Sequence, residues 1–202
     1  MKKGVKMDNN RNHPGDKDND AFLIADFNQC FEQTRHYNTQ IVNTLKFITT
    51  FYTAVCGLVW GLFQYSIKKN IDIKSALIIA LCVVLLFGII ILIFAVRNRV
   101  YFVKCMRYVN EQRGYFLSRI SPKFANKSGM PVDPAKLKYF NWSSSQSWLV
   151  YIISLMNSLI LGLFLFILVN RVDVALLSGI CLFIIQLLLS ICYLCSQDHG
   201  KI

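Results

Sequence analysis

Three residues near the carboxyl end of this chain have the types and spacing of metal ligands. Cys192, Cys195 and His199 recur three and four positions apart, so a helix would carry all three on one face. A closed zinc site takes four ligands, however, and only these three cluster. Free thiols at a helix end are the simpler interpretation, and the sequence predicts no metal site.

Glu32 and His36 are a second candidate pair, because residues four positions apart meet on one helix face. They either coordinate a metal or lie on a solvated face, and we favour the solvated face. The sequence contains no Ser–His–Asp grouping, no phosphate-binding glycine loop and no paired acidic site. We therefore expect a protein that is not an enzyme and that binds no cofactor.

Four uncharged apolar runs dominate the rest of the sequence. Each reaches the roughly 20 apolar residues that a helix needs to cross the roughly 30 Å hydrocarbon layer of a membrane. Hydrophobic residues make up 54% of the 202 positions and charged residues only 16%, which favours an integral membrane protein. The runs cover residues 47–67, 75–96, 148–170 and 174–195. We predict an all-α membrane protein with four transmembrane helices in two hairpins.

Positive charge lies almost entirely on one side of these runs. Of the 22 Lys and Arg residues, 18 fall before the first run, between the second and third, or after the last. The short connections 68–74 and 171–173 hold the other 4. Segments rich in Lys and Arg stay in the cytoplasm. The sequence therefore predicts a multi-pass protein of the bacterial inner membrane with its N- and C-termini in the cytoplasm.

The segments outside the runs have distinct patterns. Residues 1–20 are polar and charged, which predicts a disordered tail, and residues 196–202 are a short cytoplasmic tail. Residues 21–46 carry apolar residues at helical spacing and should continue without a break into the first run. This helix either packs on the rest of the cytoplasmic layer, which we favour, or lies on the lipid surface. Residues 97–147 are predicted to form a basic helix, ended by Ser121-Pro122, and a loop.

The apolar runs contain no Asp, Glu, Lys, Arg or His, which argues against an ion-coupled transporter. Asn157 and Gln186 are expected to hydrogen-bond across helices; lining a pore is the alternative. Small residues at four-residue spacing allow close helix contact, either within one protomer or between protomers. They are Thr53, Gly57 and Gly61 on the first run, Ser154, Ser158 and Gly162 on the third, and Ala175 and Gly179 on the fourth. We expect the chain to form a homo-oligomer.

The basic segment between the second and third runs is the candidate binding surface. Its cations would attract anionic lipid headgroups by default. An anionic soluble ligand such as a nucleotide is an alternative, and nucleic acid is not expected. We favour a cytoplasmic protein partner, because Arg and aromatic side chains dominate interface hot spots. The candidate residues are Arg97, Arg99, Lys104, Arg107, Arg113, Tyr139 and Trp142.

Three short strings carry a resemblance: RHYNTQ at 35–40, RNRVYF at 97–102 and FNWSSSQ at 140–146. Together they resemble a group of uncharacterised small four-span membrane proteins of bacteria, over about residues 22–169. The resemblance implies the same architecture and no particular activity. The architecture is also similar to that of the small membrane subunits of bacterial antiviral defence systems, in which a cytoplasmic sensor controls an oligomeric membrane protein.

Two functional hypotheses follow from these patterns. The first is a membrane anchor or regulatory subunit that self-associates and presents a basic cytoplasmic face to a soluble partner. The alternative is an effector that perturbs the membrane or forms a pore, as in antiviral defence. A small-solute channel is a third and less favoured hypothesis.

Overall fold

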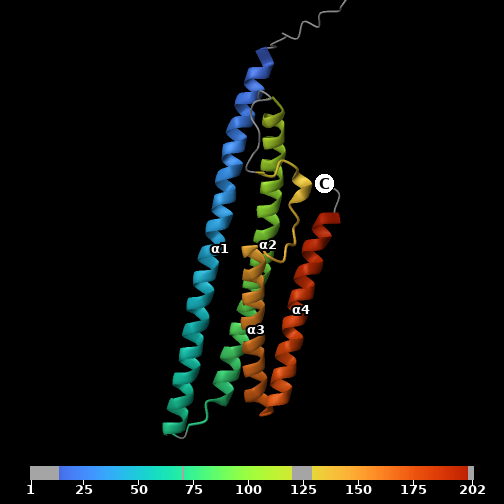
Figure 1. Cartoon of the computed structure of the whole chain (residues 1–202). Helices are drawn as coiled ribbons and strands as arrows, with labels where there is room; N and C mark the ends of the chain where they lie inside the picture. The colour runs from blue at the N-terminus through green and yellow to red at the C-terminus, as the bar shows by residue number, and fades with distance from the viewer. Residues whose placement is uncertain (1–13, 70, 120–128, 200–202) are drawn as a thin grey trace, which may run out of the picture.

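The computed structural model describes residues 14–69, 71–119 and 129–199, with side chains for 20–69, 71–119 and 129–198. Within these ranges the only regular structure is helical (Figure 1). The elements are α1 Pro14–Lys69, α2 Lys74–Arg119, the 3-10 turn η1 Pro134–Lys136, α3 Ser145–Val169 and α4 Val172–His199. All 4 α-helices are long and apolar enough to cross a membrane. The prediction of an all-α protein with four candidate spans is therefore confirmed.

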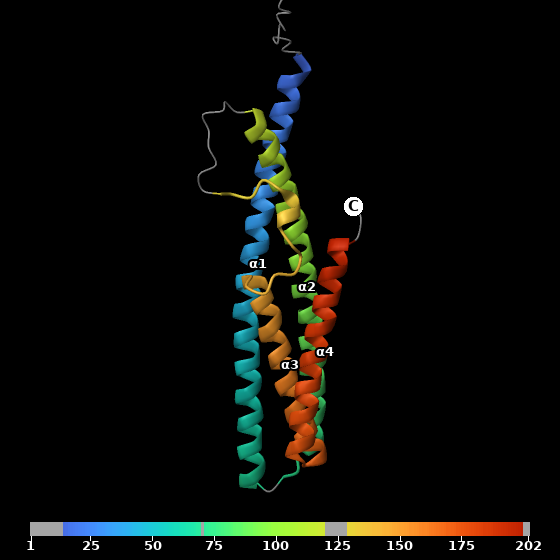
Figure 2. The same cartoon turned by 45° about the vertical axis from the view of Figure 1, so that its right-hand side comes forward.

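The molecule has two layers, because α1 and α2 are much longer than α3 and α4. At one end all four helices lie side by side, and both short connections between helices are found there (Figures 1 and 2). Beyond the start of α3, α4 continues for a short distance and α1 and α2 continue much further, with the segment before α3 lying along α2. We call residues 20–46, 97–119 and 129–144 the charged layer, and residues 47–69, 71–96 and 145–198 the four-helix layer.

Two helix ends differ from the sequence prediction. α1 begins at Pro14, inside the range 1–20 that was expected to be a disordered tail. Proline suits the first turn of a helix, and the Asp20 carboxylate is held by Arg119 of α2 at 2.7 Å. α4 continues through residues 196–199, which were expected to be a tail. Residues 1–13 and the helix end predicted at Ser121-Pro122 lie outside the described residues.

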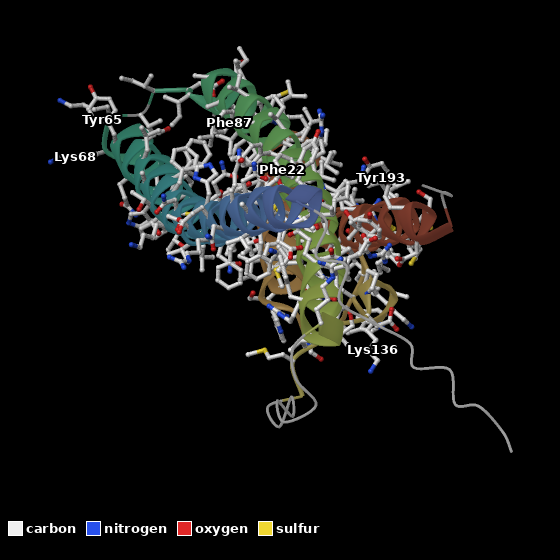
Figure 3. All side chains as sticks on the ribbon, turned by 90° about the horizontal axis from the view of Figure 1, so that it is seen from above. Phe22, Tyr65, Lys68, Phe87, Lys136 and Tyr193 are labelled. Carbon is white, nitrogen blue, oxygen red and sulfur yellow. The ribbon has the colours of Figure 1, made fainter. Side chains whose placement is uncertain are left out.

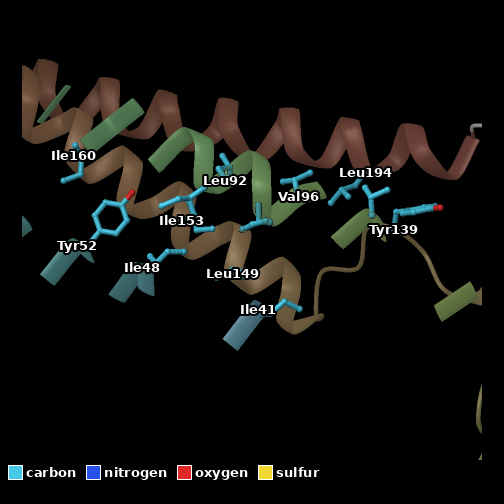
Figure 4. Close-up of a cluster of buried hydrophobic side chains, with 14 of the residues drawn as sticks. Ile41, Ile48, Tyr52, Leu92, Val96, Tyr139, Leu149, Ile153, Ile160 and Leu194 are labelled. Atoms are coloured by element: carbon cyan, nitrogen blue, oxygen red, sulfur yellow. The ribbon is translucent and has the colours of Figure 1, made fainter. Parts of the chain in front are cut away.

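The core of the four-helix layer draws residues from every helix (Figure 4). Ile48 of α1, Leu81 of α2 and Ile153 of α3 are each at most 1% exposed. A polar contact lies among them, because the Tyr52 hydroxyl donates to Asn157 Oδ1 at 2.7 Å. The expectation that Asn157 hydrogen-bonds across helices is therefore confirmed.

Glycine permits the closest helix contacts in this layer. A Cβ at Gly88 of α2 would stand 1.9 Å from Asn157 Oδ1 and 2.5 Å from the Tyr52 hydroxyl. A Cβ at Gly179 of α4 would stand 3.0 Å from the carbonyl oxygen of Ser158, and one at Gly162 would stand 3.3 Å from that of Ala175. Small residues thus let the helix backbones approach where lipid removes the usual hydrophobic drive.

Local sequence explains where α3 begins and ends. Ser144 is its N-cap, and the Ser144 Oγ accepts a hydrogen bond from the backbone N–H of Ser147 at 3.2 Å. Asn170 ends the helix in the left-handed conformation at φ 55°, and its N–H donates to the Phe166 carbonyl at 2.8 Å. Asparagine tolerates this conformation better than most residues, so the chain turns at once into α4.

Candidate binding surfaces

Buried Arg99 joins α2 to the segment that precedes α3. Its side chain is 5% exposed. Nε donates to the Tyr139 carbonyl at 2.8 Å, Nη2 to the Lys138 carbonyl at 3.0 Å, and Nη1 to Gln146 Oε1 at 2.9 Å. Burial lowers the pKa of the Arg99 guanidinium from its usual value, and the nearby Asp198 partly offsets this.

Two further arginines of α2 bind the same segment. Arg107 Nε donates to the Leu137 carbonyl at 2.8 Å, its guanidinium lies 4.3 Å from the Tyr139 ring centroid, and it pairs with Asp198 of α4. Arg113 Nη1 donates to the Pro131 carbonyl at 3.0 Å. We call Arg99, Arg107 and Arg113 the inner arginines.

Part of the predicted binding surface is in fact used inside the protein. Arg99 and Tyr139, which is 1% exposed, are too buried to meet a partner. Arg107 and Arg113 are engaged within the fold. The physical reason is that a mostly irregular segment leaves backbone carbonyls without partners, and arginine supplies several donors in one planar group.

The remaining predicted residues face outward. Trp142 is 66% exposed, and its ring packs edge-on against Phe140 with 4.8 Å between the ring centroids. Arg97 and Lys104 are exposed on the side of α2 that faces α4. Arg97 donates to the hydroxyl of Tyr101 at 3.3 Å, and this hydrogen bond lowers the pKa of Tyr101 from its usual value.

A groove of about 670 Å³ lies between α2 and α4. Both helices run in the same direction, and α4 diverges from α2 toward its C-terminal end (Figure 1). The wall from α2 comprises Ile89, Leu92, Ile93, Val96, Arg97, Val100, Tyr101 and Lys104, and the wall from α4 comprises Leu182, Ile185, Gln186, Leu189, Ser190, Tyr193 and Gln197. We call this the α2–α4 groove.

Sequence reasoning missed this groove, although a signal was present. Gln186, Ser190, Tyr193 and Gln197 recur at helical spacing on α4, as do Arg97, Tyr101 and Lys104 on α2. Each stripe alone is a mixed polar face, and only the packing of α2 beside α4 brings the two together. Gln186, expected to bond across helices, has no hydrogen-bond partner among the described residues.

The two sets of small residues have opposite environments. Ser154 and Ser158 are 0% and 5% exposed, and Gly162 contacts the backbone of α4. This α3 set is therefore used within the protomer. On α1, Thr53, Gly57 and Gly61 are exposed, and a Cβ at either glycine would meet nothing within 4 Å.

In the charged layer, α1 and α2 are joined by side-chain contacts. Asp26 Oδ2 accepts hydrogen bonds from the Tyr108 hydroxyl and Gln112 Nε2, both at 2.7 Å, and the bond to Asp26 raises the pKa of Tyr108. Cys30 is 9% exposed, and burial, with the nearby Cys105 and Asp26, raises its pKa to about 11. These contacts favour a helix packed on α2 over one lying on lipid.

The candidate metal ligands make other contacts where they are described. Glu32 pairs with Arg35 at 3.2 Å, and His36 Nε2 lies 2.8 Å from Gln40 Nε2, so both residues bond along the exposed helix face. No group of three or more His, Cys, Asp or Glu side chains among those described could hold a metal ion. The side chain of His199 lies outside that set, so the expectation that it forms no metal site with Cys192 and Cys195 stays a prediction.

Comparison with known proteins adds no relative. No family model, curated protein or solved structure matches the chain.

Proposed function

We propose that this chain is a non-catalytic, multi-pass protein of the bacterial inner membrane that presents its charged layer to a soluble cytoplasmic protein, as an anchor or regulatory subunit. The bias of 18 of the 22 Lys and Arg residues toward one side supports this orientation. The connections between α1 and α2 and between α3 and α4 both lie at the end opposite the charged layer (Figure 1). This arrangement is the one expected if both termini are in the cytoplasm and both connections are on the other side of the membrane.

One observation carries the proposal of a protein partner. Phe22 is 69% exposed near the N-terminal end of α1 (Figure 3), and Ile24, two positions further along, is 51% exposed. Phe22 precedes Phe47, where the apolar run begins, by 25 positions, which corresponds to about 37 Å along the helix. The headgroup region is only about 5–8 Å thick on each side. Lipid cannot cover these side chains at that height, whereas a soluble protein can.

The charged layer is also ordered before any partner arrives. The inner arginines hold the segment 129–144 against α2, and Asp26 joins α1 to α2. A prearranged surface loses less conformational entropy on binding than a flexible one. Inside the four-helix layer, Tyr52 and Asn157 turn their polar groups toward each other, which favours an anchor over a pore lined by this single chain.

Photo-crosslinking in cells tests the partner. A photoreactive phenylalanine analogue at Phe22 is expected to give a discrete adduct with a soluble protein. The same analogue at Leu58, which is 59% exposed in the apolar part of α1, should give adducts with lipid or with a second copy of this chain, but none with a soluble protein. The double variant Phe22→Ser, Ile24→Ser should lose the protein adduct formed from a second analogue at Glu32, with unchanged membrane insertion.

Reporter fusions provide the orientation control. Fusions after Ile202 and beside Asp72 should report opposite compartments, with Ile202 in the cytoplasm. An outward-facing Ile202, or lipid adducts alone at Phe22, would contradict the proposal.

We also propose that the chain self-associates through the exposed small residues of α1. Thr53, Gly57 and Gly61 are the set that internal packing leaves open. Close approach of a second helix at such residues gains van der Waals contact and backbone interactions that larger side chains prevent. The α3 set of Ser154, Ser158 and Gly162, expected from sequence as an alternative interface, is packed within the protomer, where Ser158 and Gly162 lie against the backbone of α4.

Replacing Gly57 and Gly61 with Ile should weaken self-association without unfolding the protomer. We expect the dissociation constant in mild detergent to rise at least tenfold, or about 1.4 kcal/mol, because the branched side chains separate the helices. Fluorescence energy transfer between labelled protomers gives the measurement. The matched control is Leu58→Ile with Leu62→Ile on the same helix. Equal transfer in both double variants would reject this interface.

A further inference from the structure

The α2–α4 groove changes from apolar to cationic along its length. Its deeper part is lined by aliphatic side chains, among them Ile89, Leu92 and Leu182. Its upper end carries Arg97, which donates to the Tyr101 hydroxyl, and Lys104, and Tyr193 also lines the groove. Among the described residues that line the groove there is no carboxylate, so the two cations have no acidic counterpart on its wall. An occupant with an apolar body and an anionic end fits this pattern.

The upper end of the groove lies at the edge of the membrane. Arg97 is the first charged residue after the apolar run of α2. A span of that length places the residues at its end in the headgroup region, whichever side of the membrane they face. The cations of the groove therefore stand where lipid phosphates are found, and its aliphatic part stands where acyl chains are found.

Gln186 is the second observation that points to a ligand. It lines the groove, it is 6% exposed, and neither its Oε1 nor its Nε2 has a hydrogen-bond partner among the described residues. A buried amide without partners is costly in an apolar setting, because both its donor and its acceptor have left water. Because Gln186 lines the groove, a polar group bound there would supply a partner.

The register of the two helices gives the depth of Gln186. Arg107 of α2 pairs with Asp198 of α4, and the helices run in the same direction. If the paired residues Arg107 and Asp198 are at the same level, residues twelve positions before each of them are level too. These residues are Ala95 on α2 and Gln186 on α4. Gln186 is therefore about 3 Å deeper than the backbone of Arg97 along the helix axis. The ester groups of a phospholipid occupy this zone, just below the phosphate.

We propose that the α2–α4 groove binds one anionic glycerophospholipid. Its phosphate is held by Arg97 and Lys104, an ester carbonyl accepts a hydrogen bond from Nε2 of Gln186, and an acyl chain lies along the aliphatic walls. The groove has the volume of a small-molecule site, for which about 300–1,000 Å³ is usual. This site is distinct from the surface near Phe22 and holds whether or not a soluble partner exists.

Charge favours a lipid over a second copy of this chain. The charged residue of α1 that lies just before its apolar run is Lys46, which is exposed, and the exposed charged residues that follow the apolar run of α2 begin with Arg97 and Lys104 themselves. A second copy would thus bring like charge against Arg97 and Lys104. A zwitterionic lipid carries its own cationic group, which competes with the two side chains for the phosphate.

Native mass spectrometry of the purified full chain tests the site. After exchange into mixed micelles with phosphatidylglycerol or phosphatidylcholine, wild type should retain one phosphatidylglycerol per protomer in at least tenfold preference. The double variant Arg97→Gln, Lys104→Gln should lose this preference. The control Lys46→Gln, Lys136→Gln removes two exposed cations outside the groove and should keep it.

Two further variants separate the parts of the site. Gln186→Leu should weaken retention of both lipids about equally, because both carry ester carbonyls. Ile185→Trp fills the aliphatic groove and should displace phosphatidylglycerol while both cations remain. Equal loss in the control double variant would show diffuse attraction and overturn the proposal. So would equal retention of the two lipids by wild type, or a dimer that forms through the groove and excludes lipid.

Discussion

Arg99→Met is expected to release the segment 129–144 from α2. The substitution keeps an apolar stem in place but removes three hydrogen bonds, to the carbonyls of Lys138 and Tyr139 and to Gln146 Oε1. Those acceptors are left without their cationic donor in a buried position. Because each unsatisfied buried group costs about 1–3 kcal/mol, we expect the variant to lose about 3 kcal/mol or more.

Limited proteolysis measures this release directly. Lys136 and Lys138 are exposed, but the segment that carries them is held by Arg99 and Arg107. Trypsin should cut there at least tenfold faster in Arg99→Met than in wild type. Arg97→Met is the matched control, two positions away and outward-facing, and should leave the rate unchanged. Arg99→Lys should behave like Arg99→Met, because one ammonium cannot reproduce the planar set of donors. Unchanged cleavage in Arg99→Met would show that the inner arginines do not hold the segment.

Gly88→Ala should disrupt the contact at which α1, α2 and α3 meet. The added Cβ would stand 1.9 Å from Asn157 Oδ1 and 2.5 Å from the Tyr52 hydroxyl, so at least one of these buried side chains must move. The move breaks their 2.7 Å hydrogen bond in a well-packed layer. Overpacking costs about 1–3 kcal/mol and the lost bond about 1 kcal/mol, so we expect a total of about 3 kcal/mol.

A double-mutant cycle shows whether the cost comes from this contact. In a background that carries both Asn157→Ala and Tyr52→Phe, the amide and the hydroxyl that the Cβ would meet are removed, and Gly88→Ala should there cost under about 1 kcal/mol. Gly57→Ala is the control, because a Cβ at Gly57 meets nothing within 4 Å. Heat unfolding in detergent, followed by circular dichroism, gives the comparison. If Gly88→Ala costs the same stability in both backgrounds, its effect does not come from the contact with Tyr52 and Asn157.

The number and position of the helices could be predicted from sequence, because apolar runs of membrane length have few other solutions. The roles of the basic residues could not. Arg97 and Arg99 differ by two positions, about 200° around the helix, and so point to opposite sides. Which side is buried depends on where the segment 129–144 docks, and that docking leaves no local pattern in α2.

The small residues show the same limit of sequence reasoning. Gly57 and Gly61 on α1 and Ser158 and Gly162 on α3 share a four-residue spacing, yet the first pair is exposed and the second is packed. The spacing indicates that a close helix contact is possible, but it does not identify the neighbouring helix. The groove was missed for a related reason, since its two polar stripes lie on helices that are separated in the chain by α3.

Because α1 is one unbroken helix, its two ends are mechanically coupled. A single helix runs from Pro14 to Lys69, and Asp26 ties its upper part to α2 through Tyr108 and Gln112. With about 37 Å between Phe47 and Phe22, a tilt of about 10° within the membrane displaces the tip by about 6 Å. The tilt is passed to the tip because α1 has no break at which the helix could bend instead. If a protein binds the tip as proposed, force on it would act as a torque on the apolar part of α1 and α2, and a change in bilayer thickness would in turn move the tip.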